Sequence, residues 1–447
     1  MLYNQWSIFY LREGVIQLTF KHGIHPNDNK EFSKDFFFEI MPVGERVYIP
    51  LSQHIGKPAL PVVQKDDYVK VGSLIGEAQG FISARIHSSI SGKVSGIINR
   101  PNSNGVMTPH IVIENDFLYN EDFLSPLLDF EQNSIINRVK ECGIVGLGGA
   151  TFPTHVKLMP KNKIKALIIN GCECEPYITT DYRLMLEKPS EIMEGIEFVR
   201  KALGVNLSYI GIEGNKKDAI YSLAQFSETE VHLFKQLKTK YPQGGEKQLI
   251  YSITKEIVPK GGLPSDIGYV VLNISTVYAI YEAVKLGKPC FSRYMTVSGS
   301  GIRRPANLFV RNGIPISEIV DYLGEEQGVV KVVLGGPMMG VSLHSYSPVT
   351  TKGSSSLLLL KEKEIREIEP TPCINCGRCA SVCPMNLLPM MTDKLILKGN
   401  TSEANKYYPM SCIECGCCAY VCPARRPLVQ SQRLAKKLVN KNKIIPA

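Results

Sequence analysis

Two stretches near the C-terminus decide the fold of that region: CINCGRCASVCP at 373–384 and CIECGCCAYVCP at 412–423. In each, three cysteines are separated by two residues, and a fourth follows after three more residues and precedes a proline. Nine of the 13 cysteines of this 447-residue chain lie between Cys373 and Cys422. A disulfide scaffold spreads its cysteines over the chain, whereas short regular spacing is typical of metal ligands. The region is therefore expected to bind metal in a reducing compartment.

The spacing C-x2-C-x2-C-x3-C-P is that of two-cluster bacterial ferredoxins, in which the fourth cysteine of each run binds the other [4Fe–4S] cluster. Zinc is the alternative, but zinc sites do not require a third cysteine at fixed spacing followed by Cys-Pro. We therefore predict two [4Fe–4S] clusters with exchanged ligands. The predicted ligands are Cys373, Cys376, Cys379 and Cys422 for the first cluster, and Cys412, Cys415, Cys418 and Cys383 for the second.

The fifth cysteine of the second stretch, Cys417, aligns with Arg378 of the first stretch and is not a predicted ligand. We interpret it as a spare thiol that packs beside the cluster. The link between the two stretches contains LPMMTDKLILKG and SEANKYYP, which have room for helices. This favours an α-helical ferredoxin domain. The scattered cysteines are expected to be buried as small apolar side chains; they are Cys142, Cys172, Cys174 and Cys290.

The length predicts three or four domains. Short strands and turn signals dominate residues 1–128, and strands alternate with helices over 129–288, which predicts a mostly parallel α/β sheet. Short strands return over 289–362, and the cysteine region follows at 363–447. The chain has no run of 18 apolar residues, so no transmembrane helix is expected, and the N-terminus lacks the features of a secretory signal.

Residues 61–98 resemble a small barrel-sandwich of the lipoyl type, with glycine or aspartate near each expected turn. Lipoyl domains present a modified lysine in a tight hairpin. The matching hairpin here, ARIHSSISG at 84–92, has no lysine, so a swinging-arm role is not expected. His87 in this hairpin is interpreted as a surface or hydrogen-bonded histidine rather than a metal ligand.

A glycine loop, GLGGATFPTHVK at 146–157, follows a predicted helix and can hold an anion through its backbone N–H groups. It does not fit the G-x-G-x-x-G fingerprint of dinucleotide-binding folds. Polar residues also follow the buried strands KALIING, at 165–171, and YVVLN, at 269–273. NGCECEP at 170–176 and YPQGGEKQ at 241–248 add further glycines and carboxylates.

Together these segments resemble the flavin- and nicotinamide-binding domain of the complex I flavoprotein subunit. The order of all parts resembles the RnfC family, subunits of the Rnf ion-translocating electron transport complex. The stretches that carry this resemblance include FKHGIHP, VKVGSLIGEAQGFISARIHSSISGKV, NGCECEPYITTDYRLM and PTPCINCGRCASVCPMNLLP. The resemblance covers essentially the whole chain. Two departures concern the loop: Thr151 stands where the flavoprotein family usually has glycine, and Leu147 stands where complex I has a basic residue.

The resemblance implies a multidomain α/β protein with four domains. They are an N-terminal β barrel-sandwich (1–128), a Rossmann-like α/β flavin/NADH domain (129–288), a β-grasp (SLBB) domain (289–362) and an α-helical two-cluster ferredoxin-like domain with a basic tail (363–447). It also implies non-covalent FMN with NAD(H) as substrate. The implied cofactor-binding residues are Gly146, Gly148, Gly149, Lys157, Asn170, Tyr241, Gly244, Asn273 and Thr276. The implied nicotinamide-site carboxylates, taken as catalytic, are Glu173, Glu175 and Glu246.

The implied function is that of a peripheral electron-transfer subunit of an ion-translocating ferredoxin:NAD+ oxidoreductase, on the cytoplasmic side of the cell membrane. Its partners would be membrane subunits, a ferredoxin-like iron–sulfur subunit and, indirectly, ferredoxin, but not nucleic acid. A basic tail is a candidate docking segment; it contains Arg425, Arg426, Arg433, Lys436, Lys437, Lys441 and Lys443. Two alternatives remain: a cobalamin reductase of the propanediol-utilisation type, and a non-catalytic iron–sulfur relay scaffold with a degenerate flavin site.

Overall fold

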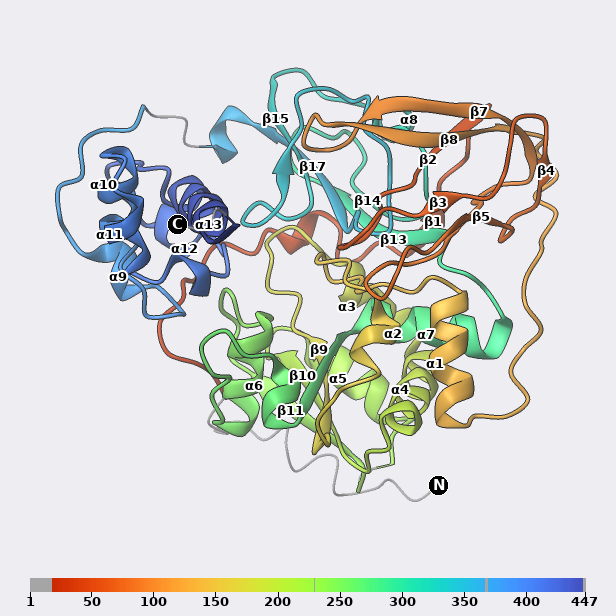
Figure 1. The fold of residues 1–447 in the computed structure, drawn as a ribbon, viewed down its shortest axis with the longest axis horizontal. Coiled ribbons are helices and arrows are strands. Elements are labelled where there is room, and N and C mark those ends of the chain that lie inside the picture. Colours follow the sequence, from red (N-terminus) through yellow and green to blue (C-terminus); the bar gives the residue numbers. More distant parts are fainter. Residues whose placement is uncertain (1–17, 229, 366–368, 445–447) are drawn as a thin grey trace.

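The computed structural model describes residues 18–228, 230–365 and 369–444, with side chains up to residue 440. Residues 1–17 of the predicted N-terminal domain, and the side chains of Lys441 and Lys443 of the predicted docking tail, lie outside the described residues. Figure 1 shows a lower α/β part, two β-rich parts above it, and a helical part to one side that ends at the C-terminus. Across the described ranges, no helix is long and apolar enough to cross a membrane.

The α/β part is built on a four-stranded parallel sheet in the order β11-β10-β9-β12. Strands β9 and β12 are runs of mostly aliphatic residues buried on both faces, as expected when helices cover both sides. Helices α1, α4 and α7 share one apolar core with the sheet, and α6 joins a second core with Leu249 and Ile250. This arrangement confirms the predicted Rossmann-like α/β domain.

The strands of this part are β9 (Ala166–Gly171), β10 (Ser208–Glu213), β11 (His232–Leu237) and β12 (Tyr269–Asn273). The helices are α1 (Gln132–Glu141), α2 (Thr154–Lys157), α3 (Thr180–Glu187), α4 (Pro189–Leu203), α5 (Lys217–Ala224), α6 (Glu246–Thr254), the 3-10 turn η3 (Pro264–Ile267) and α7 (Ile274–Leu286).

The first β-rich part is a sandwich of a four-stranded sheet, β2-β8-β7-β4, and a three-stranded sheet, β3-β5-β6. His87 is buried in β6 and hydrogen-bonds the backbone of Glu141, in line with the interpretation of a hydrogen-bonded histidine. The strands are β2 (Arg46–Pro50), β3 (Leu60–Pro61), β4 (Tyr68–Val69), β5 (Leu74–Glu77), β6 (Ile86–His87), β7 (Gly92–Pro101) and β8 (Met107–Asn115).

The second β-rich part is a six-stranded mixed sheet, β1-β14-β13-β17-β15-β16, against which α8 packs. One helix on a mixed sheet fits the predicted β-grasp domain. Its apolar core is continuous with that of the barrel-sandwich. The elements are β1 (Phe38–Ile40), β13 (Ser292–Ser298), β14 (Ala306–Arg311), α8 (Ile316–Leu323), β15 (Val329–Leu334), β16 (Val341–Ser342), β17 (Ser356–Lys361) and the 3-10 turn η4 (Glu362–Glu364).

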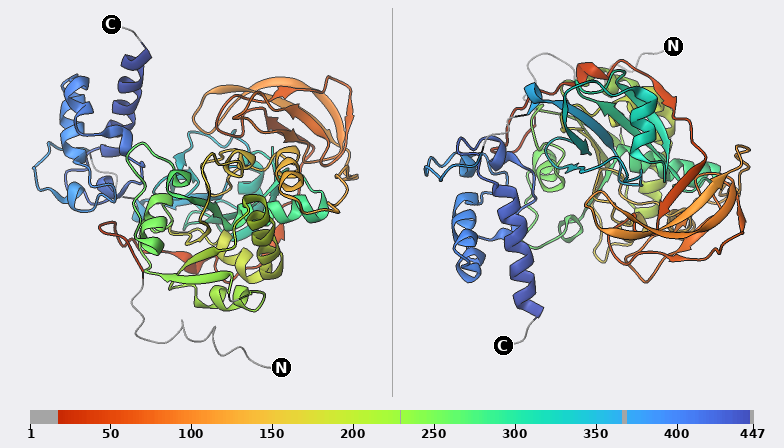
Figure 2. Two further views of the ribbon diagram at one scale, coloured as in Figure 1. Left: turned by 60° about the horizontal axis from the view of Figure 1, so that its bottom comes forward. Right: turned by 90° about the horizontal axis from the view of Figure 1, so that it is seen from above.

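All the secondary-structure elements described in the cysteine region are helices, joined by loops that carry most of the cysteines, which confirms the predicted α-helical domain. Figure 2 shows this part beside the α/β part, which is the predicted flavin-type domain, with α13 extending toward the C-terminus. Its elements are α9 (Arg378–Ser381), α10 (Pro389–Leu397), α11 (Thr401–Asn405), the 3-10 turn η5 (Pro409–Ser411), α12 (Cys417–Tyr420) and α13 (Leu428–Ile444).

Residues 18–40 run across three of these parts. Leu18 bridges to Leu237 at the end of β11, and Ile24 bridges to Tyr241 in the loop that follows. The 3-10 turn η2 (Lys30–Phe32) follows, and β1 then adds a parallel strand beside β14. This segment brings Lys30 and Gly23 next to residues that are far away in the sequence.

Candidate functional site

The predicted flavin-site residues gather at one edge of the parallel sheet. Strand β9 ends at Gly171, the neighbouring β12 ends at Asn273, and Asn170 pairs with Asn273 across the two strands. Loops at the carboxyl ends of parallel strands form the usual ligand crevice of α/β folds. The sheet therefore brings together residues about a hundred positions apart in the sequence.

The glycine loop folds back over this edge. Gly146 donates its N–H to the carbonyl of Phe152, and Thr151 donates to the carbonyl of Gly146. A Cβ atom at Gly148 would lie 3.2 Å from the Cβ of Asn273, so this glycine permits close packing on the strand end. Gly149 has φ +113° and open space where a side chain would be. A glycine loop with an open backbone face fits the close approach of a flavin or phosphate group.

The asparagines and Thr276 hold the loops around this crevice. Asn170 donates from Nδ2 to the carbonyl of Gly244, 2.9 Å away, and accepts the N–H of Cys172. Thr276 accepts the N–H of Leu147 at 2.8 Å, which ties the glycine loop to the start of α7. Asn273 is the N-cap of α7 and accepts the N–H of Ser275.

A residue missed by sequence reasoning, Asp181, anchors this cap. Its carboxylate accepts from Asn273 Nδ2 and from Ser275 Oγ, both at 2.5 Å. Its N–H in turn donates to Glu173. Asp181 lies in the quoted stretch NGCECEPYITTDYRLM, but nothing in the sequence showed that it would contact residues at the end of β12.

Lys157 and Glu246 form a partly exposed ion pair beside β12. Lys157 Nζ lies 2.8 Å from Glu246 Oε1 and 3.2 Å from the carbonyl oxygen of Val271. Both side chains are about one-third exposed, so the pair is open to exchange with a charged ligand. The structure thus brings a predicted phosphate-facing cation next to a predicted nicotinamide-site carboxylate.

Glu173 points into a buried charge cluster. Its Oε1 accepts the N–H of Asp181 at 2.6 Å, while its Oε2 has no hydrogen-bond partner and lies 3.6 Å from Lys30 Nζ. Burial raises the pKa of Glu173 to about 7, and the charge of Lys30 opposes this rise. Glu213 and Lys216 complete the cluster as a second buried ion pair. Sequence reasoning missed Lys30, which carries no local signal because it lies 143 positions before Glu173 in the sequence.

Glu175 lies where three domains meet. It accepts the N–H of Met338 at 3.0 Å and the hydroxyl of Tyr241 at 3.5 Å. Burial raises the pKa of Glu175 to about 7, because little water remains to solvate the carboxylate. Tyr241 itself is only 1% exposed, and its carbonyl accepts from Ile24 N–H and from Cys417 Sγ. These residues connect the flavin-type domain to the second cysteine motif.

The predicted ligands of the second cluster line one small cavity. Cys383 of the first motif lines it together with Cys412, Cys415 and Cys418 of the second motif. Burial raises the pKa of Cys412 to about 11, so metal binding there is accompanied by loss of protons from the thiols. The donor set and its arrangement fit a [4Fe–4S] cluster with one exchanged ligand.

The first motif shows the complementary arrangement. Cys379 packs with Cys422 of the second motif, and Arg426 acts electrostatically on both Cys373 and Cys422. Within the described ranges, no group of three or more cysteine, histidine or carboxylate side chains could hold a single metal ion. A [4Fe–4S] cluster has a different requirement, because each cysteine binds its own iron atom and the four thiolates surround the cluster.

Three family models match this chain. They are the Nuo51 FMN-binding domain at residues 139–282, the RnfC barrel sandwich hybrid domain at 18–118 and a 4Fe-4S dicluster domain at 372–425. The chain is 41% identical over 400 residues to the C subunit of the proton-translocating ferredoxin:NAD(+) oxidoreductase complex of Clostridium ljungdahlii, covering 87% of each chain. It is 42% identical over 435 residues to the C subunit of the Na(+)-translocating ferredoxin:NAD(+) oxidoreductase complex of Acetobacterium woodii, covering 94% of this chain and 96% of the relative. The chain belongs to the RnfC family.

A third RnfC relative, the C subunit of the ion-translocating oxidoreductase complex of Rhodobacter capsulatus, is 42% identical over 445 residues, covering 96% of this chain and 85% of the relative. The family and the domain matches confirm the predicted order of barrel-sandwich, FMN-binding and two-cluster domains. They also confirm FMN and iron–sulfur clusters as its cofactors. The individual ligands and the domain boundaries stay predictions.

The two glycine-loop residues that differ from the flavoprotein family, Thr151 and Leu147, lie in different surroundings in this RnfC chain. Thr151 adopts φ +48°, a left-handed conformation that glycine adopts more readily. Its methyl group would lie 2.9 Å from a Cβ at Gly353, so the loop packs against the β-grasp domain. Leu147 is 5% exposed and part of the α/β core, whereas a basic residue would need solvent or a partner.

The scattered cysteines are mostly buried as predicted. Cys142, Cys172 and Cys290 are buried, and Cys174 is partly exposed and accepts the N–H of Gly244 through its sulfur. Cys417, the predicted spare thiol, is fully buried against Tyr241 and Cys415.

Proposed function

We propose that this chain is the peripheral electron-transfer subunit of an ion-translocating ferredoxin:NAD+ oxidoreductase. It would pass electrons between two [4Fe–4S] clusters, FMN and NAD(H). The observation that carries this proposal is the direct contact between the FMN-binding domain and the cavity of the second cysteine motif, through Tyr241 and Cys417. Hydride transfer moves two electrons together, whereas a cluster carries one. A flavin beside a cluster can therefore convert two-electron transfer into one-electron transfer.

The proposed ligand sets follow the exchange between the motifs. Cys373, Cys376, Cys379 and Cys422 would bind the first cluster, and Cys412, Cys415, Cys418 and Cys383 the second. The cavity shared by Cys383 with the second motif supports this assignment. The packing of Cys379 with Cys422 supports it for the first motif.

For the flavin, the residues around the strand ends have separate proposed roles. The backbone of the loop at Gly146, Gly148 and Gly149 would approach the cofactor, with the N–H of Gly146 already bonded to the carbonyl of Phe152. Lys157 would exchange its ion pair with Glu246 for the negative charge of the phosphate. Asn170, Asn273 and Thr276 tether the loops around the strand ends, and Tyr241 and Gly244 would contact the cofactor beside them.

Glu173, Glu175 and Glu246 are the proposed carboxylates of the nicotinamide site. Glu173 and Glu175 both have raised pKa values because they are buried, so each can hold a proton near neutral pH. Their placement between the flavin crevice and the second motif suits groups that adjust charge as electrons arrive and leave.

We further propose that the second cluster is the one close to the flavin, and that the first faces a partner. Three contacts hold the second cavity against other domains: Gly23 N–H to the carbonyl of Val382, Gln248 Nε2 to the carbonyl of Pro384, and Cys417 to Tyr241. Cys376 and its neighbour Ile374 of the first motif are exposed. An exposed cluster edge suits electron exchange with another iron–sulfur protein of the complex.

The chain would be attached to the cytoplasmic side of the cell membrane through membrane subunits of the complex, with ferredoxin acting indirectly. The basic residues of α13 and the barrel-sandwich are candidate docking surfaces. Arg433 and Lys436 in α13 pair with Glu414, which leaves the exposed Lys437 among the cations that could meet an acidic partner. The family match favours this function over a cobalamin reductase, and the FMN-domain match favours it over a relay scaffold with a degenerate flavin site.

Anaerobic purification followed by iron and flavin analysis and an NADH titration tests the proposal. We expect about eight iron atoms per chain, from two [4Fe–4S] clusters, with one FMN. NADH should bleach the flavin and then the clusters. Intact clusters without flavin, or clusters that NADH leaves oxidised in flavin-loaded protein, would contradict the function.

A further inference from the structure

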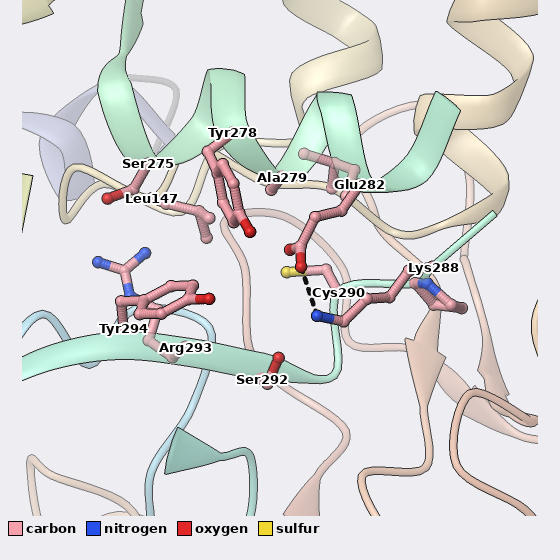
Figure 3. Close-up of a pocket in the computed structure, with 12 residues that line it drawn as sticks. Leu147, Ser275, Tyr278, Ala279, Glu282, Lys288, Cys290, Ser292, Arg293 and Tyr294 are labelled. Atoms are coloured by element: carbon pink, nitrogen blue, oxygen red, sulfur yellow. Dashed lines mark hydrogen bonds and ion pairs between the residues drawn. The ribbon is translucent and has the colours of Figure 1, made fainter. Parts of the chain in front are cut away.

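A separate small cavity lies between α7 and β13, where the flavin-type and β-grasp domains meet (Figure 3). None of the residues proposed to bind flavin, nicotinamide or clusters lines it. Ser275 and Tyr278 face it from α7, and Ser292 and Tyr294 from β13. The cavity therefore carries four hydroxyl groups from two domains.

Arg293 lines this cavity and lacks the hydrogen-bond partners that a buried guanidinium needs. It is 3% exposed, and its Nε and Nη1 atoms are buried without a hydrogen-bond partner. The other two buried arginines of the described ranges have partners: Arg138 donates to the carbonyl of Ala283, and Arg183 pairs with Glu187. A buried guanidinium that lacks its hydrogen bonds is costly, so the protein is expected to supply an acceptor.

The neighbouring charged groups do not supply that acceptor. Lys288 and Glu282, at the other end of the cavity, pair with each other (Figure 3). The carboxylate of Asp181 influences Arg293 electrostatically, but its two oxygens already accept from Asn273 and Ser275. Burial lowers the pKa of Arg293 to about 10, which leaves the guanidinium protonated at neutral pH. A positive charge without a hydrogen-bonded counter-ion remains.

We propose that Arg293 is the anchor of a binding site for a small oxyanion, the carboxylate or phosphate group of a ligand, held between α7 and β13. The guanidinium fork binds such groups through paired N–H bonds. The hydroxyls of Tyr294 and Ser292 are the donors available around it, since the hydroxyl of Tyr278 already donates to that of Tyr294. A bound anion would join the flavin-type domain to the β-grasp domain. Asp181 would link it to the start of α7, because the Asp181 carboxylate accepts a hydrogen bond from Asn273, the N-cap of that helix.

Isothermal titration of the full-length, flavin- and cluster-loaded chain under anaerobic conditions tests this site. Inorganic phosphate and acetate are titrated separately, at ionic strength matched with chloride, so that the two arms identify the chemistry of the ligand. We expect saturable binding of at least one of them. Arg293→Met should weaken that binding about tenfold or more, and Arg293→Lys should weaken it less. Arg304→Met, at an exposed ion pair with Glu39 in the same domain, is the control and should leave binding unchanged.

Three results would overturn the proposal: no saturable binding of either anion, equal binding by Arg293→Met and the parent chain, or release of FMN as phosphate binds. The last result would assign the space to the flavin phosphate itself, and flavin fluorescence reports it. If Arg293→Met does not fold, Tyr294→Phe and Ser292→Ala each remove one hydroxyl from the cavity. A decrease in affinity in either variant supports the site, and full affinity in both contradicts it.

Discussion

Cys415 and Cys376 occupy the same place in the two cysteine motifs, yet they lie in opposite surroundings. Cys415 is 7% exposed and packs with Ile24, Tyr241 and Cys417, whereas Cys376 is exposed. The spacing of the cysteines determines which metal group they can bind, and the spacing is the same in the two motifs. The residues around them determine where electrons can enter and leave, and these differ. The difference supports the proposal that the second motif lies on the flavin side and that the first faces a partner.

The largest effect is expected from Cys383→Ser. Although Cys383 belongs to the first motif, it lines the cavity of the second, so its loss should remove the second cluster and stop electron flow from the flavin. Iron content, EPR spectra and NADH-driven reduction are the measurements. Loss of the first cluster with retention of the second would reject the exchanged ligation. Cys417→Ser, at the non-ligand cysteine, is the control and should retain about eight iron atoms.

The contact that holds the second motif against the flavin-type domain is tested by Tyr241→Ala. Tyr241 is almost fully buried beside Cys417 and Glu175, so the change should lower the free energy of unfolding by about 3–5 kcal/mol. It should also slow reduction of the clusters by NADH. Chemical denaturation followed by circular dichroism measures the first effect. Tyr408→Ala, at a tyrosine that is 53% exposed, should cost much less; equal costs would contradict the assigned contact.

Lys157→Met tests the flavin side of the comparison. If Lys157 exchanges its pair with Glu246 for the flavin phosphate, the variant should bind FMN about tenfold more weakly, because one charge-assisted hydrogen bond is lost. Both clusters should be retained. Flavin fluorescence titration provides the affinity, with Lys161→Met, an exposed lysine, as the matched control. Unchanged FMN affinity in Lys157→Met would exclude Lys157 from the flavin site.

The smallest effect concerns pH. The pKa of Glu175 is raised to about 7 in the folded chain from 4.5, so the folded state holds this proton more tightly than the unfolded state. The free energy of unfolding is therefore expected to fall as pH rises from about 4.5 through about 7, and by about 1 kcal/mol between pH 6 and 8. Urea denaturation at the two pH values measures it. Glu175→Gln should remove this part of the dependence, and an unchanged dependence would show that Glu175 is not its source.

Local chemistry made much of this fold predictable from the sequence. The cysteine spacing predicted the two-cluster domain, and the apolar runs at 165–171 and 269–273 predicted two buried strands, which the structure places side by side in the parallel sheet. Long-range contacts could not be predicted in this way. The ion pair of Glu173 with Lys30 depends on the path of residues 18–40, and the unpartnered Arg293 becomes visible only when α7 and β13 pack together.

The most direct test of the central claim is anaerobic NADH reduction of Cys422→Ser, a variant that should lose the first cluster and keep the second. We predict about four iron atoms per chain, bound FMN, and a remaining cluster that NADH reduces at close to the parent rate. A flavin-loaded variant whose remaining cluster NADH cannot reduce would contradict the claim that the second cluster lies on the flavin side.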